Sequence, residues 1–116
     1  MSKRTVTLYI DDALEAIEAI ESYIDGLSFR TFRDDRKTYS ATIREYIVIG
    51  EAIAHTIDML EEKIPDFPWR VIKDFRNIIV HEYFGVDAEM VWDISTGRLS
   101  ELREKLVLFK RLDGVE

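Results

Sequence analysis

Two long stretches of this chain place apolar residues at steps of three and four, which is the spacing of one face of an α-helix. In the first stretch, from about Leu8 to Leu27, the apolar residues are Ile10, Leu14, Ile17, Ile20, Ile24 and Leu27. In the second, from about Thr38 to Glu62, the stripe consists of Ile43, Tyr46, Gly50, Ile53, Ile57 and Leu60. A chain with two such stripes must bury them against each other or against further helices. The sequence therefore predicts a helical bundle.

Three residues of these stretches carry separate information. Gly50 lies on the apolar stripe itself, where glycine costs roughly 1 kcal/mol of helix propensity against alanine, so we expect another helix to approach closely there. Gly26 is a stop signal for the first helix. Glu21 falls close to the apolar stripe, and nothing in the sequence accounts for it.

The remaining segments predict shorter elements. Ser28 to Lys37 is predicted to be a loop with one helical turn around Phe32, and Pro65 and Pro68 bracket a connection. A helix should begin near Pro68 or Trp69, since proline is well tolerated in a first helical turn. Further elements follow in chain order: an N-cap at Asp87, a helix holding Met90, Val91, Trp92 and Ile94, an interruption at Gly97, and a final stripe of Leu99, Leu102, Leu106 and Phe109 that runs to about Leu112. We predict one all-α domain over residues 1–116, an up-down bundle of four main helices plus short pieces.

The composition limits the class of protein. The chain is 47% hydrophobic and lacks cysteine. It has no apolar run long enough for a membrane helix, so we expect a cytoplasmic protein without a membrane segment. A net charge of −7 argues against a broad nucleic-acid-binding surface and leaves room only for local contacts. Two basic clusters qualify: Arg30, Arg33, Arg36, Lys37 and Arg44, which are more simply solvated charges, and Arg70, Lys73 and Arg76.

The segment from Asp74 to Asp87 holds the unusual chemistry. On a helical wheel one arc carries apolar residues expected in the core: Val71, Ile72, Phe75, Ile78 and Ile79. The other arc carries polar residues: Arg70, Lys73, Asp74, Arg76, Asn77, His81 and Tyr83. Trp69, Val80 and Phe84 also fall on the polar side. Large apolar groups on a solvent-facing side indicate that another protein surface packs against them. We therefore predict a two-fold dimer that pairs two such faces.

Several alternatives stay open at this point. Arg76 has no acidic residue three or four positions away on its own helix, but a partner from another helix is possible. His81 can be an interface histidine, and Tyr83 can pack at a dimer seam. The spacing of Glu51, His55 and Asp58 suggests a metal, but such residues on a charged helix are usually a solvated face, and we assign no metal there.

Several blocks resemble one known family. The run RNIIVHEY, from Arg76 to Tyr83, is similar to the Arg-x4-His-x-Tyr motif of HepT-like toxins in the HEPN superfamily. The blocks IGEA at 49–52, PDFPWR at 65–70 and VWDI at 91–94 match that family's pattern in the same order. Two positions depart from it, since Glu45 and Ile47 stand where the family would favour Asn and Glu. If these positions line the cleft that the two paired faces would form, they bear on substrate choice or activity.

The resemblance implies a metal-independent endoribonuclease toxin that needs no cofactor, acts on RNA and belongs to a type II-like or type VII toxin–antitoxin system. By the same resemblance, Arg76 binds the scissile phosphate, His81 is the general base or acid, and Asn77, Lys73 and Arg70 support them. A minimal nucleotidyltransferase antitoxin would silence the enzyme, with Tyr83 as the acceptor of AMP. The alternative is a non-catalytic module that keeps the fold and binds a nucleotidyltransferase.

Overall fold

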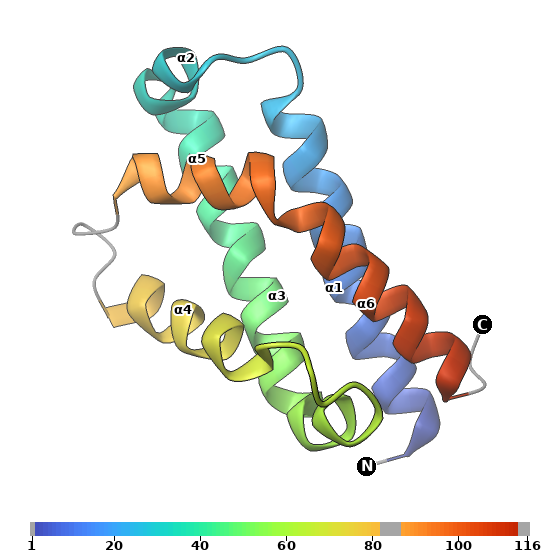
Figure 1. The fold of residues 1–116 in the computed structure, drawn as a ribbon. Helices are drawn as coiled ribbons and strands as arrows, with labels where there is room; N and C mark the ends of the chain where they lie inside the picture. The colour runs from blue at the N-terminus through green and yellow to red at the C-terminus, as the bar shows by residue number, and fades with distance from the viewer. Residues whose placement is uncertain (1, 82–86, 114–116) are drawn as a thin grey trace.

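A computed structural model describes residues 2–81 and 87–113 of the chain. The described residues form helices and no strands, so the prediction of an all-α bundle is confirmed. The helices are α1 (Lys3–Ile24), α2 (Phe29–Asp34), α3 (Arg36–Lys63), α4 (Trp69–His81), α5 (Ala88–Gly97) and α6 (Leu99–Leu112) (Figure 1).

The two long predicted stripes pack against each other. Helices α1 and α3 run antiparallel along most of their length, and the core between them includes Ile10, Ile17 and Ile53 (Figure 1). Helix α1 begins earlier than the apolar pattern indicated, because the Ser2 side chain accepts a hydrogen bond from the backbone N–H of Thr5 and caps the first turn. The chain leaves α1 through Gly26, whose positive φ lies in the left-handed region that favours glycine.

Helix α6 lies against α1 and accounts for Glu21. The Glu21 carboxylate forms an ion pair with Arg103 in the first half of α6, and Lys110 near the end of α6 donates a 2.7 Å hydrogen bond to Asp11. These contacts hold α6 antiparallel to α1. The two ends of the described chain consequently lie at the same end of the bundle, far from the last turn of α4 (Figure 1).

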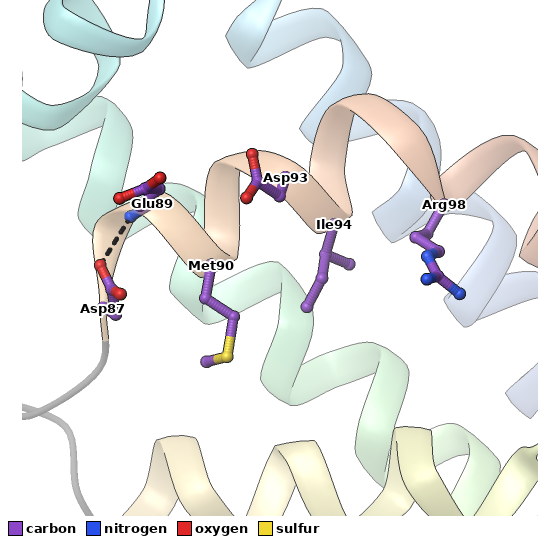
Figure 2. Close-up of a pocket in the computed structure, with 6 residues that line it drawn as sticks. All are labelled: Asp87, Glu89, Met90, Asp93, Ile94 and Arg98. Atoms are coloured by element: carbon purple, nitrogen blue, oxygen red, sulfur yellow. Dashed lines mark hydrogen bonds between the residues drawn. The ribbon is translucent and has the colours of Figure 1, made fainter.

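The short helices α2 and α5 cap the opposite end. The turn expected around Phe32 is a six-residue helix, and the buried Phe32 ring lies 5.3 Å from that of Trp92 in α5. The predicted N-cap is confirmed, since Asp87 Oδ1 accepts a 2.9 Å hydrogen bond from Glu89 N–H (Figure 2). Helix α5 ends at Gly97 and α6 begins at Leu99, so the expected interruption is also present.

The face of α4 that packs against α3 differs in part from the face that the helical wheel predicted. Ile72, Phe75 and Ile79 contribute to the core as expected, but Val71 is 66% exposed and Ile78 is 45% exposed. Trp69, expected on the uncovered side, is buried within its own chain. The wheel was wrong here because the 64–68 connection folds back over the first turn of α4, so that Trp69 Nε1 donates a 2.9 Å hydrogen bond to the Ile64 carbonyl.

Candidate functional site

Helix α4 approaches α3 closely at Gly50, as the glycine on the apolar stripe predicted. A Cβ at Gly50 would lie 2.5 Å from Arg76 Cγ, closer still to Arg76 Cβ and 3.4 Å from its Cα. No side chain fits at that distance, so glycine is required for Arg76 to lie against α3. The base of the Arg76 side chain is thereby fixed on the backbone of α3.

The guanidinium of Arg76 is held by two oxygen acceptors. Its Nη1 donates a 2.8 Å hydrogen bond to Asn77 Oδ1, and its Nη2 is hydrogen-bonded to Glu51 Oε1 of α3. The partner left open by the sequence is therefore Glu51, which follows Gly50 directly. The Arg76 side chain is 28% exposed, and its buried Nε has no hydrogen-bond partner among the described residues.

The Glu51 carboxylate also faces a histidine. Its Oε2 lies 3.8 Å from His55 Nε2, one turn further along α3. The His55 ring stacks on the Tyr9 ring of α1, with centroids 4.7 Å apart and planes 9° apart. Glu51 thus lies between an arginine from α4 and a histidine supported by α1. The sequence suggested a solvated face for Glu51 and His55 because their partners are remote in the chain.

His81 is the last residue of α4 and is exposed. Within the described residues no hydrogen bond or ion pair joins it to Arg76, as expected for two side chains that a straight helix points in well-separated directions. Asn77 precedes His81 by one turn and contacts Arg76 directly. Tyr83, the proposed modification site, lies outside the described residues, as does Phe84.

The other two basic residues of α4 have separate surroundings. Arg70 donates two 3.0 Å hydrogen bonds to the carboxylate of Glu61, and the pair ties the first turn of α4 to the end of α3. Lys73 is half-buried and forms no ion pair with any residue that the structure describes. Within the part of the chain that the structure describes, Arg70 and Arg76 are therefore paired with different glutamates of α3, while Lys73 has no acidic partner.

Of the two positions that depart from the family pattern, Glu45 faces away from α4. Its carboxylate accepts a 2.8 Å hydrogen bond from the Tyr23 hydroxyl of α1, and this bond is the main cause of a raised pKa at Tyr23. Ile47 is partly buried against the core. Glu45 is consequently a contact between α1 and α3 and does not touch Arg76.

A buried hydrogen bond connects α3 to α5. The Tyr46 and Ser95 hydroxyl oxygens are 2.6 Å apart, and Ser95 Oγ also donates to the Val91 carbonyl at 2.7 Å. Because the serine has one hydroxyl hydrogen, the Tyr46 hydroxyl is the donor between the two. Burial raises the pKa of Tyr46 well above its ordinary value, and its ring packs edge-on against Phe75 of α4.

An apolar hollow of about 510 Å³ lies over α3, between α4 on one side and α5 and α6 on the other. It is lined by Tyr46, Ile49, Phe67, Pro68, Val71, Ile72, Phe75, Ile94, Arg98, Leu99, Glu101 and Leu102. A shallower depression on α5 adjoins it, where Ile94, Arg98 and Met90 project on the side facing α4 while Asp93 points the other way (Figure 2). None of the predicted site residues that the structure describes lines either one, so Arg76 lies outside both.

Over residues 2–81 and 87–113, no group of three His, Cys, Asp or Glu side chains is arranged to hold a metal ion. Glu51 and His55, which were considered as ligands on the basis of their spacing, face Arg76 and Tyr9 instead. In the same part of the chain, no helix combines the length and apolar character needed to cross a membrane.

Comparison with known proteins yields one family. The model of the "Ribonuclease HepT-like" family matches residues 13–108. "Putative RNase MJ0127" of Methanocaldococcus jannaschii is 31% identical over 115 residues, which cover 98% of this chain and 95% of that protein. "Probable ribonuclease HepT" of Thermococcus cleftensis is 35% identical over 103 residues, which cover 89% of this chain and 94% of that protein. No solved structure matches the chain.

Proposed function

The chain belongs to the HepT-like ribonuclease family, and on this basis we propose that it is a metal-independent endoribonuclease that uses Arg76 and His81. The observation that carries the proposal is the Arg76 guanidinium, fixed by Glu51 and Asn77 on the helix that ends in the exposed His81. A guanidinium is suited to phosphate, and histidine transfers protons near neutral pH.

In the proposed reaction the 2′-hydroxyl of RNA attacks the adjacent phosphorus. A new bond forms between O2′ and phosphorus, the bond from phosphorus to O5′ breaks, and the products are a cyclic phosphate and a 5′-hydroxyl. His81 takes the 2′-hydroxyl proton or supplies one to the leaving O5′. Arg76 stabilises the charge that develops on the phosphate oxygens, while Asn77 orients the guanidinium and Lys73 and Arg70 attract the flanking phosphates.

Purified protein should therefore cut RNA in the presence of EDTA. We expect Arg76→Ala and His81→Ala each to lower cutting by at least about 100-fold, since a lost charge-stabilising or proton-transfer group typically costs that much. Arg103→Ala is the matched control, because Arg103 also pairs with a glutamate of another helix and is similarly exposed, but lies on α6. Unchanged cutting in Arg76→Ala would refute the assignment.

We further propose that the protein is a cytoplasmic toxin held in check by a minimal nucleotidyltransferase antitoxin that transfers AMP to Tyr83. Tyr83 follows His81 closely in the sequence, so an added AMP phosphate would place negative charge and bulk near the phosphate site. Mass spectrometry of the co-expressed protein tests this proposal. A silenced complex in which Tyr83 is unmodified would contradict the transfer.

A homodimer is the expected assembly. Val80 is exposed on the side of α4 that carries Lys73 and Arg76. Val71 and Ile78 are exposed on the opposite side of the helix, where Val71 lines the apolar hollow. A second copy covering the side of α4 that carries Val80 would remove this side chain from water and bring together two sets of α4 basic residues. Sedimentation at micromolar concentration checks the prediction, and a monomer would contradict it.

One observation favours a second candidate, a non-catalytic module that binds a nucleotidyltransferase. Arg76 is already paired with Glu51, so its charge can serve the contact between α3 and α4 alone. This candidate predicts a stable complex with the nucleotidyltransferase, no RNA cutting, and a destabilised fold in Arg76→Ala. Cutting by the wild-type protein that Arg76→Ala abolishes without loss of fold excludes it.

A further inference from the structure

The Glu51 carboxylate connects three helices at the proposed phosphate site. One oxygen accepts from Arg76 of α4, the other faces His55, and the His55 ring rests on Tyr9 of α1. The carboxylate is 40% exposed and therefore reaches the surface beside the guanidinium. It is close enough to a bound phosphate to influence how that phosphate meets Arg76.

The Arg76 side chain is fixed at both ends. Its Cβ and Cγ lie against Gly50, and its two terminal nitrogens are bonded to Asn77 and Glu51. A guanidinium is planar and has its donors in a rigid fork, so two acceptors determine the direction of the remaining terminal hydrogens. Those hydrogens are the ones left for a phosphate.

The same contact opposes RNA binding. Glu51 offsets the positive charge of Arg76, so a phosphate meets a paired arginine instead of a free one. Removing the charge while keeping an acceptor should strengthen binding, whereas removing the acceptor should release the guanidinium. The two effects act on different kinetic constants and can be separated.

The His55–Tyr9 stack limits where the carboxylate can move. Glutamate has several rotatable side-chain bonds, so Glu51 alone would sample several positions. His55 Nε2 stands 3.8 Å from the oxygen that Arg76 does not use. This separation is too long for a direct hydrogen bond but short enough to block that side. The parallel contact with Tyr9 keeps the imidazole in place.

We propose that Glu51 is a positioning residue for RNA cleavage, which fixes the direction of the Arg76 guanidinium while weakening RNA affinity, and that the His55–Tyr9 stack holds Glu51 in place. This inference rests on the proposed ribonuclease function. Glu51 acts through Arg76 and does not touch the reacting atoms.

Steady-state kinetics on a short RNA separate the two effects. Glu51→Gln keeps an acceptor without the charge, so KM should fall several-fold while kcat stays within about two-fold. Glu51→Ala loses the acceptor, and kcat should fall about ten-fold or more, since small misplacements of a catalytic group carry large costs. Glu21→Gln, which removes the charge from a similar Arg–Glu pair between α1 and α6, should change neither constant.

The stack has its own pair of variants. His55→Ala should lower kcat toward the value of the Glu51→Ala variant. His55→Phe should keep kcat near the wild-type value, because a phenyl ring retains the contact with Tyr9. Equal kcat values for Glu51→Ala and the wild-type protein would overturn the positioning role. A His55→Ala variant with wild-type kcat would overturn the role of the stack.

A measurement on the guanidinium keeps the two proposals apart. In 15N NMR spectra, rotation about the Arg76 Nε–Cζ bond should be slow in the wild-type protein and fast in Glu51→Ala, with or without RNA cutting. If the wild-type protein cuts no RNA but shows this difference, the ribonuclease proposal fails and the positioning of Arg76 stands. Fast rotation in the wild-type protein would overturn the positioning itself.

Discussion

The first and last turns of α4 are held to α3 by different means. At the first turn, Trp69 is 1% exposed, hydrogen-bonds to the Ile64 carbonyl and packs edge-on against Phe67, and the Arg70–Glu61 pair lies outside in solvent. Toward the last turns Ile79 is also buried, but the group that comes closest to α3 is the arginine Arg76, which lies on a glycine.

The difference separates anchoring from chemistry. An indole supplies a large buried area and one satisfied donor, so the base of α4 is held mainly by burial. The closest contact at the Arg76 end is made by a charged group, which contributes less to stability than a buried indole and which the proposed function uses to bind a phosphate. Because the base anchors α4, its far end can carry polar groups without the helix coming loose.

Replacing the indole should have the largest effect on stability. We expect Trp69→Ala to lower the free energy of unfolding by about 3–5 kcal/mol, the usual cost of truncating a buried Trp. Urea denaturation measures it, and Trp69→Phe, which keeps much of the ring, should lose clearly less. A loss below about 1 kcal/mol would mean that burial does not anchor the base of α4.

The second-largest loss of stability is expected from adding one methyl group at Gly50, where α4 crosses α3. Gly50→Ala should cost about 1–3 kcal/mol, because overlap with Arg76 Cβ outweighs the gain in helix propensity, and RNA cutting should fall with it. Gly97→Ala is the matched control, since a Cβ at this other helical glycine meets nothing within 4 Å. If both variants kept wild-type stability, the close approach would be wrong.

A variant of Tyr46 in α3 tests the packing at the middle of α4, because the Tyr46 ring packs on Phe75. Tyr46→Phe should cost about 1 kcal/mol at neutral pH through the lost hydrogen bond to Ser95. Burial raises the Tyr46 pKa, so the folded state retains the proton and stability should fall as the pH rises above about 10, the value for an unfolded tyrosine. Urea denaturation near neutral pH and again above the ordinary tyrosine pKa measures this effect. Between the two pH values, the free energy of unfolding should fall less for Tyr46→Phe than for the wild-type protein.

The smallest effect is expected at Arg70. An exposed pair of this kind contributes about 0.2–1 kcal/mol, so Arg70→Ala should barely move the thermal midpoint, and added salt should reduce the difference further. Arg76→Ala, measured in parallel, should cost more because it leaves Glu51 without its partner at a half-buried contact. Equal costs for the two arginines would remove the distinction between the two ends of α4.

The sequence predicted the bundle from the stripes of α1 and α3, because an apolar period of three to four residues is a local property. It misplaced Val71, Ile78 and Trp69, since a helical wheel gives the angle between residues but not the direction of the neighbouring helix. The Glu51–Arg76 pair spans 25 positions and depends on the crossing of two helices. The sequence feature that pointed to this pair was Gly50, which predicted that another helix comes close to α3 but not which residue of that helix makes the contact.

The pairing of Asp11 with Lys110 has a practical consequence. It helps to place both ends of the described chain at one end of the bundle, opposite the last turn of α4 (Figure 1). An affinity tag, a fluorescent protein or a surface tether joined at either end would project away from Arg76 and His81. Immobilised protein attached in this way should keep the side that carries Arg76 and His81 open to solution, which suits single-molecule measurements of the proposed RNA binding and cutting.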